Sequence, residues 1–191
     1  VPARDYGHDL DAMAAAIRPN TQLIWIANPN NPTGTFVPPA QLRAFVDRVP
    51  RRVVVVVDEA YNEYLPPHER VDTTSWLATL PNLVITRTFS KIYGMAGLRV
   101  GYALTSAEIA DLMNRVRQPF NCNNLALAAA VAALDDHAFV AQSYEANRAG
   151  MEQIVAGLKR LDCGHIPSHG NFVTFHVGNA AQVNQRLLER G

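Results

Sequence analysis

Cysteine is scarce in this chain of 191 residues, and several other signals of specialised function are missing. The two cysteines, Cys122 and Cys163, lie far apart without a CxxC spacing, so the sequence predicts neither a disulfide framework nor a metal site. No uninterrupted apolar run is long enough to cross a bilayer. Basic and acidic residues number 17 each, and this zero net charge gives no indication of nucleic-acid binding. We expect a globular protein of the reducing cytoplasm.

The two ends of the sequence suggest a longer protein. The chain begins at Val1 with no signal peptide, and it stops at Gly191 directly after the amphipathic pattern of Val183, Leu187 and Leu188. A helix that ends there would normally lead into another element. We therefore expect an internal fragment that is cut at both ends.

Strand-like and helix-like stretches alternate along the chain. Strands are expected at 22–27, 53–57, 82–87, 99–104 and 171–177, and helices at 39–49, 106–117, 124–134, 138–161 and 180–190. The consecutive valines of 53–57 indicate a strand that is buried on both faces. This pattern predicts an α/β fold whose mostly parallel central sheet is sandwiched by helices, with the long helix at 138–161 leading towards a smaller domain.

Three polar residues each follow a predicted strand. Asn31 follows the first strand, Asp58 the second and Lys91 the third. Ligands of parallel sheets bind beyond the carboxyl ends of the strands, so this shared position predicts one common site.

Lys91 lies among small and hydroxyl-bearing residues, in the segment 87–99 that reads Arg-Thr-Phe-Ser-Lys-Ile-Tyr-Gly-Met-Ala-Gly-Leu-Arg. A partly desolvated lysine can act as an amine nucleophile. Thr88, Ser90 and Arg99 offer two hydroxyl donors and a bidentate cation, which suit a phosphate dianion. A solvated surface lysine is the alternative interpretation.

Asp58 ends the valine strand and is followed by Tyr61. A carboxylate there needs a partner, and a protonated pyridine nitrogen would be one, although a helix N-cap is an equal alternative. Tyr61 could bond a cofactor's phenolic oxygen or be a core aromatic residue. The loop 28–34 (Asn-Pro-Asn-Asn-Pro-Thr-Gly) is stiffened by its prolines, which can aim Asn31 at a ligand or simply make a tight turn.

Together these three motifs resemble, in order and approximate spacing, those of the fold-type-I pyridoxal 5'-phosphate (PLP) enzymes of aminotransferase class I/II. The resemblance implies an aspartate-aminotransferase-like large domain at 1–145 and the start of a smaller α+β domain at 146–191. It implies that Lys91 forms the Schiff base and moves the proton, that Asp58 pairs with the pyridine nitrogen, and that Asn31 and Tyr61 bind the phenolic oxygen. The implied phosphate ligands are Thr88, Ser90 and Arg99.

Within the family, this sequence is most similar to the histidinol-phosphate aminotransferase branch. Three segments carry this similarity: the one around Lys91, 58–64 (Asp-Glu-Ala-Tyr-Asn-Glu-Tyr) and 170–173 (Gly-Asn-Phe-Val). This resemblance implies a transaminase of histidine biosynthesis that uses a small-molecule amino donor and a 2-oxo acid. It also implies a homodimer with the site at the interface, and 61–64 and 118–124 are candidate segments of the interface or of the edge of the site. The family's phosphate-loop glycine, its ring-stacking aromatic residue and its carboxylate-binding arginine have no match in this chain.

Other activities of the same scaffold remain open at the level of sequence. An aromatic amino acid aminotransferase or a phosphothreonine-type decarboxylase would use the same cofactor motifs, because these reactions share a carbanion. A non-catalytic PLP-sensing domain of a transcription regulator is a further alternative, although this chain contains no basic DNA-binding segment. A degenerate scaffold that binds nothing would not need these lysine, aspartate, asparagine, tyrosine and arginine residues together.

Overall fold

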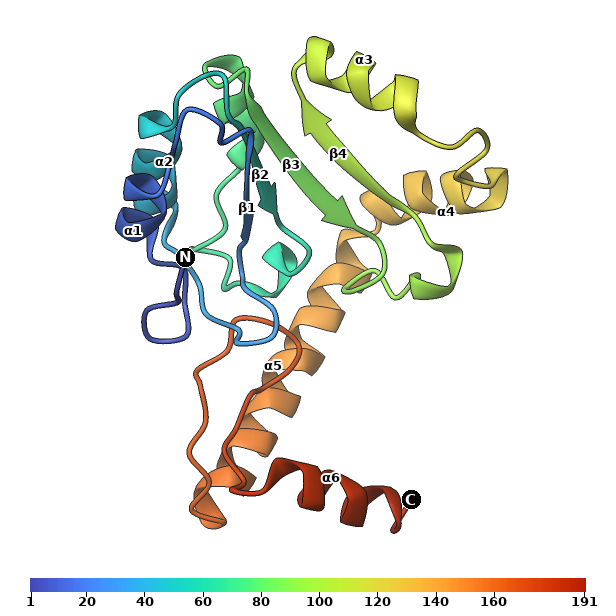
Figure 1. Ribbon diagram of the computed structural model, residues 1–191. Helices are drawn as coiled ribbons and strands as arrows, with labels where there is room; N and C mark the ends of the chain where they lie inside the picture. Colours follow the sequence, from blue (N-terminus) through green and yellow to red (C-terminus); the bar gives the residue numbers. More distant parts are fainter.

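The computed structural model describes residues 1–191 and contains one four-stranded sheet (Figure 1). The strands β1 (Leu23–Ala27), β2 (Val54–Asp58), β3 (Leu83–Thr88) and β4 (Gly101–Thr105) lie side by side in that order. The first three are parallel to one another, and β4 runs antiparallel to β3. The predicted α/β fold with a mostly parallel sheet is therefore confirmed. The short connection at 89–100 explains why β4 runs antiparallel, since a parallel return needs a longer crossover.

Six α-helices accompany the sheet. They are α1 (Leu10–Ala15), α2 (Pro39–Arg48), α3 (Ala107–Val116), α4 (Asn124–Asp135), α5 (His137–Arg160) and α6 (Ala180–Leu188), with short 3₁₀ turns η1 (Asn62–Tyr64), η2 (Thr73–Ala78) and η3 (Ala96–Leu98). In Figure 1, α1 and α2 stack beside the sheet, and α5 runs from the sheet to the C-terminal part that carries α6. All five expected helices are present; the short α1 was not expected.

The main hydrophobic core lies between α2 and one face of the sheet. Leu42, Phe45 and Val46 of α2 are almost completely buried, as their shared helical face predicts. They belong to one cluster with the side chains that alternate inwards along β1, β2 and β3, including Ile26 and Val57. Each large side chain that is fully buried in this way contributes about 1.5–3 kcal/mol to stability.

The opposite face of the sheet is also apolar, but it is partly open to solvent. Val56 and Val84 are buried on this face, in agreement with the prediction that the valine strand is covered on both sides. Leu23 and Trp25 of β1, in contrast, are 55% and 53% exposed. By strand alternation, Asp58 of β2 shares this second face with Val56.

The strand expected at 171–177 does not form, so this prediction was wrong. Only one isolated bridge joins His165 and Phe175, because no neighbouring strand extends the ladder, and β-branched composition alone does not make a strand. The segment instead packs on the loop that follows β1. Thr174 donates a hydrogen bond to the carbonyl of Pro32 (2.5 Å), and the His169 N–H donates to the carbonyl of Gly34 (2.8 Å).

Gly34 is the closest point of this contact, and we expect Gly34→Ala to destabilise it. A Cβ on Gly34 would lie 2.1 Å from the Ser168 hydroxyl and 2.7 Å from the Ser168 Cα, and the φ of Gly34 is +77°. The expected loss is about 1–3 kcal/mol of unfolding free energy, measured in urea. The matched control is Gly150→Ala in α5, where a Cβ meets nothing within 4 Å. Because alanine favours a helix more than glycine does, this variant should gain about 0.5–1 kcal/mol of unfolding free energy. Equal stabilities of the two variants would contradict the tight packing.

No single helix has both the length and the apolar composition to cross a membrane. Only α4 and α5 taken together, bent by 79° to one another, reach that length and composition. Cys122 and Cys163 are both free, and no group of three or more His, Cys, Asp or Glu side chains is placed to hold a metal ion.

Candidate active site

The carboxyl edge of the sheet gathers the predicted site residues. Asp58 is the last residue of β2, and Asn31 follows β1 by four positions. Thr88 is the last residue of β3 and pairs with Gly101, the first residue of β4. Because β4 is antiparallel, its beginning lies at the edge where the other strands end. Arg99, just before β4, therefore reaches the same edge as Lys91.

Asn31, Tyr61 and Lys91 form the first group at this edge. The Asn31 side-chain amide donates a hydrogen bond to the Tyr61 hydroxyl at 2.9 Å, and Tyr61 is only 5% exposed. The Lys91 Nζ lies 5.3 Å from the centre of the Tyr61 ring. Phe172, from the C-terminal segment, packs edge-on against Tyr61 with 5.1 Å between ring centres. An amine nucleophile therefore lies beside an amide and a phenol that can both donate to one oxygen of a ligand.

Thr88, Ser90 and Arg99 form the second group. The Ser90 N–H donates to the Thr88 hydroxyl at 3.1 Å, and the Arg99 guanidinium donates to the Ser90 hydroxyl at 3.4 Å. Arg99 has a φ of +52°, which is uncommon for a residue other than glycine. The Arg99 side chain borders an open cavity of about 630 Å³ between β4 and α3. These hydroxyls and the guanidinium offer charge-assisted hydrogen bonds to an anion.

Asp58 lies between β1 and β3, and no hydrogen bond links it to either group. Its Oδ1 accepts from the Ala60 N–H at 3.2 Å, which closes a local turn. Its other oxygen accepts no hydrogen bond from the chain. The alternative of a helix N-cap is not realised, because the 3₁₀ turn η1 has Tyr61 in that position. One carboxylate oxygen is thus available to a ligand at this edge.

Glu59 is an important residue that the sequence reasoning missed. Since neighbouring strand residues face opposite sides of a sheet, Glu59 points away from Asp58 towards the main core. Its buried carboxylate accepts from the Arg87 Nε at 2.8 Å and from the Thr73 hydroxyl at 2.5 Å. Burial acts to lower the pKa of Arg87, but the charge and hydrogen bond of Glu59 outweigh it and raise the pKa. The pair anchors the turn that carries both Asp58 and Tyr61. The signal in the sequence was the second acidic residue directly after the strand.

Glu63 and Tyr93 are two titratable groups near this ion pair. Burial raises the pKa of Glu63, and this effect is partly offset by a backbone hydrogen bond and by the Arg87 charge. Burial, together with the Glu63 charge, raises the pKa of Tyr93 to about 12.

We expect Glu63→Gln to stabilise the protein at pH 7. A raised carboxyl pKa means that the folded state binds the proton more tightly, so the stability from Glu63 is present at low pH and is lost as the pH rises. The variant should unfold a few degrees higher at pH 7, and the difference should vanish as the pH falls towards 4.5, the ordinary pKa of the group. Thermal unfolding at several pH values, beside Glu189→Gln at an exposed site, measures this. A gain that does not change with pH would contradict the burial argument.

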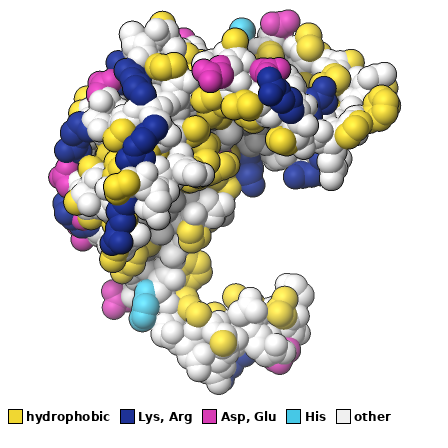
Figure 2. Space-filling model, turned by 45° about the horizontal axis from the view of Figure 1, so that its top comes forward, with side chains coloured by type: hydrophobic (Ala, Val, Ile, Leu, Met, Phe, Trp, Pro, Cys, Tyr) yellow, Lys and Arg dark blue, Asp and Glu magenta, His cyan; other side chains and the backbone are white.

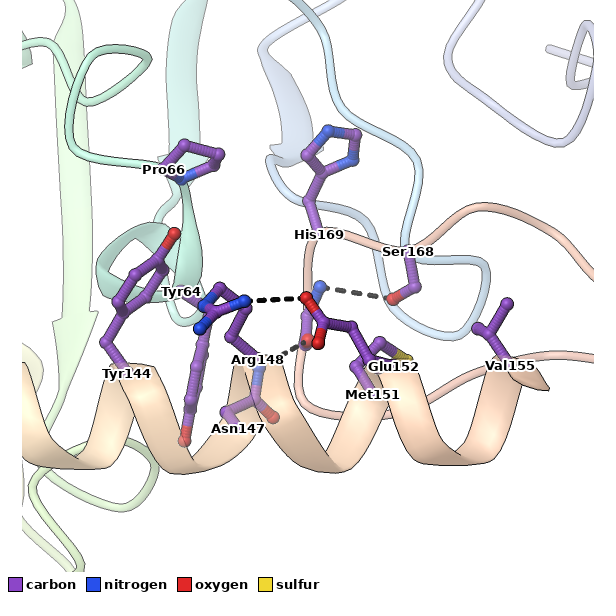
Figure 3. Close-up of a pocket in the computed structure, with 11 residues that line it drawn as sticks. Tyr64, Pro66, Tyr144, Asn147, Arg148, Met151, Glu152, Val155, Ser168 and His169 are labelled. Carbon is purple, nitrogen blue, oxygen red and sulfur yellow. Dashed lines mark hydrogen bonds and ion pairs between the residues drawn. The ribbon is translucent and has the colours of Figure 1, made fainter. Parts of the chain in front are cut away.

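A separate cavity of about 370 Å³ lies between α5 and the segment 168–170 (Figure 3). Tyr64, Tyr144, Arg148 and His169 are among its lining residues, and it contains none of the predicted site residues. Arg148 is held by Glu145 and Glu152 of the same helix. The Asn147 amide donates to the carbonyl of Gly170 at 3.3 Å, so this region connects α5 to the C-terminal segment.

Comparison with known proteins identifies the family. The sequence matches aminotransferase class I and II along residues 1–191. The chain belongs to this family. It is 72% identical over 190 residues to histidinol-phosphate aminotransferase 1 of Dechloromonas aromatica (strain RCB), in a match that covers 100% of this chain and 52% of the relative. The chain thus spans about half the length of the curated relatives that it matches.

Solved structures of this aminotransferase fold agree with the comparison of sequences. The histidinol-phosphate aminotransferase of Sinorhizobium meliloti, crystallised in complex with pyridoxal-5'-phosphate, superposes with a TM-score of 0.90 at 32% identity, over 100% of this chain and 52% of that one. The L-threonine-O-3-phosphate decarboxylase of Porphyromonas gingivalis superposes with a TM-score of 0.78 at 26% identity, over 90% of this chain and 53% of that one. The fold is thus shared with an enzyme named for a different reaction.

Proposed function

We propose that this chain is part of a PLP-dependent aminotransferase that moves an amino group from histidinol phosphate to 2-oxoglutarate. The products would be imidazole-acetol phosphate and glutamate, in histidine biosynthesis. The observation that carries the proposal is the position of Lys91 beside the hydrogen-bonded Asn31–Tyr61 pair at the carboxyl edge of the sheet. The similarity to enzymes named histidinol-phosphate aminotransferase supports the choice of substrate.

The donor set fits each polar part of the cofactor. Asn31 and Tyr61 suit a phenolic oxygen, and the free oxygen of Asp58 suits a protonated ring nitrogen. Thr88, Ser90 and Arg99 suit the phosphate, because they combine two hydroxyls with a guanidinium that is linked to Ser90. Lys91 supplies the amine that would hold the cofactor covalently.

The proposed roles follow from these positions. The bound cofactor supplies an electron-withdrawing ring that stabilises the carbanion left when the substrate Cα loses a proton. Lys91 would hold the cofactor through its Nζ, and the free amine would accept the proton that the substrate Cα loses and return it later in the reaction. Asp58 would keep the ring nitrogen protonated, and Asn31 and Tyr61 would hold the ring in one orientation.

We further propose that residues 1–145 belong to the PLP-binding large domain and 146–191 to the start of a small domain, in a cytoplasmic homodimer. Large apolar side chains stay exposed on and between α3 and α4, with Val116 at 83%, Phe120 at 96% and Leu125 at 80%. Figure 2 shows hydrophobic side chains gathered at one end of the upper part of the molecule, which carries α3 and α4. A hollow separates this part from the C-terminal part that carries α6. The segment 118–124 is thus largely available for an interface, whereas Tyr61 of the other candidate segment is buried. A monomer in light scattering at micromolar concentration would contradict the dimer.

Because this chain spans about half the length of its curated relatives, the reaction is tested with the purified full-length protein and PLP. Turnover of histidinol phosphate should require 2-oxoglutarate and should release glutamate in equal amount. Turnover of aromatic amino acids but not of histidinol phosphate would contradict the proposed substrate and indicate an aromatic amino acid aminotransferase. Release of carbon dioxide without a keto acid would indicate a decarboxylase instead, and binding of PLP without any turnover would favour a sensor domain.

A further inference from the structure

Thr86 of β3 carries a buried hydroxyl that the proposed mechanism does not use. Its Oγ1 is inaccessible to solvent and has no hydrogen-bond partner in the chain. Burying an unpaired hydroxyl opposes folding, because the group gives up its hydrogen bonds to water without replacement. A valine has nearly the same shape without that penalty. The hydroxyl therefore needs a partner that the free chain does not provide.

The sheet register places Thr86 directly beside Asp58. The two residues are Cα partners in the parallel pair β2–β3, so their side chains emerge on the same face. On its other side Asp58 pairs with Ala27, which has no polar side-chain atom. The preceding row on this face is formed by Trp25, Val56 and Val84 and is apolar. Asp58 therefore has two strand partners, and of their side chains only that of Thr86 can donate a hydrogen bond to its carboxylate.

Both groups have unused hydrogen-bonding capacity. Asp58 receives one side-chain hydrogen bond, from the Ala60 N–H, and its second oxygen receives none. The next hydroxyl along β3, that of Thr88, already accepts from the Ser90 N–H.

We propose that Thr86 is a positioning residue of the cofactor site, whose hydroxyl donates a hydrogen bond to the Asp58 carboxylate when that carboxylate pairs with the ring nitrogen of the bound cofactor. This inference rests on the proposed function. The hydrogen bond would fix the orientation of the carboxylate and stabilise its negative charge beside the apolar side chains of Val56 and Val84. A donor to a charged acceptor forms the stronger class of hydrogen bond.

The test compares PLP affinity with the stability of the cofactor-free protein in two variants. Thr86→Val removes only the hydroxyl, and Thr86→Ser retains it. PLP binding is followed by absorbance titration, and stability by thermal unfolding without cofactor. We expect Thr86→Val to weaken PLP binding about tenfold, which corresponds to about 1.4 kcal/mol, while its cofactor-free form unfolds at or above the wild-type temperature. Thr86→Ser should bind within about twofold of wild type.

Thr105→Val is the matched control, because its hydroxyl is already bonded to the carbonyl of Leu83 at 2.7 Å. That variant should lose stability without cofactor and keep its PLP affinity. Unchanged affinity in Thr86→Val, equal losses in the Val and Ser variants, or a loss of affinity that accompanies a loss of cofactor-free stability would each overturn the role of Thr86. If the wild-type protein itself binds no PLP, the proposed function fails together with the role of Thr86. If the wild type binds PLP and only the pattern among the variants differs, the role of Thr86 fails alone.

Discussion

Lys91→Ala is expected to abolish covalent attachment of the cofactor and to lower kcat by on the order of 10⁴-fold, because it removes both the anchoring amine and the group that moves the proton. The attachment is measured by adding PLP, reducing with borohydride and mapping the pyridoxyl label by mass spectrometry. The label should appear on the peptide that contains Lys91, and it should be absent from the variant.

The chain offers an unusually clean control for this experiment. Its sequence contains only two lysines, Lys91 and Lys159, and Lys159 lies in the last turn of α5. Lys159→Ala should retain both the label and the activity. A label on Lys159 in place of Lys91, or a Lys91→Ala protein that turns over at the wild-type rate, would show that the amine nucleophile has been assigned to the wrong residue.

The second large effect is expected from Glu59→Gln, on stability. Glu59 has a side chain only 2% exposed and pairs with Arg87, whose side chain is 18% exposed. Removing the carboxylate charge leaves the guanidinium largely buried without its counter-ion, so the free energy of unfolding should fall by about 3 kcal/mol. Denaturation in urea measures this loss. The raised pKa of Arg87 keeps the guanidinium charged. When folding raises the pKa of a basic group, the resulting stability is lost only at pH values above the ordinary pKa of that group. The loss should therefore be the same at pH 6 and at pH 9.

Asp47→Asn is the matched control for Glu59→Gln, since it neutralises a carboxylate at nearly the same distance from an arginine. The Arg43–Asp47 pair of α2 is separated by 2.9 Å but is 33% and 47% exposed. Such a pair contributes little in water, so the variant should lose no more than about 0.5 kcal/mol. Similar losses in both variants would mean that the Glu59–Arg87 pair does not anchor the turn that carries Asp58 and Tyr61.

Much of the sheet and the site could be predicted from local sequence. The run of valines specified a strand with two buried faces, and the structure buries Val55, Val56 and Val57. The rule that ligands bind beyond strand ends placed Asn31, Asp58 and Lys91 at one edge, where the structure has them. Their chemical roles remain predictions, because they depend on a ligand that only binding experiments can introduce.

The remaining features depend on which segments meet, and local patterns do not specify that. Residues 171–177 have the composition of a strand, but their backbone groups find no ladder to join. Glu59 appears in sequence as one more acidic residue, and only the pairing of β2 with β3 brings it to Arg87. The unpaired hydroxyl of Thr86 likewise follows from register, because Asp58 lies 28 positions earlier in the chain.

The antiparallel direction of β4 has a consequence for the order in which the site assembles. Ser90 and Arg99 are nine positions apart within a single hairpin connection, whereas Asn31 and Tyr61 are 30 positions apart and meet only after β1 pairs with β2. Closing a short loop costs less conformational entropy than closing a long one, so contacts between near neighbours in sequence form faster. The anion-binding half of the site is therefore expected to form first during folding and to open last in urea. A partly unfolded chain would then still bind inorganic phosphate at urea concentrations where it no longer binds the ring of the cofactor.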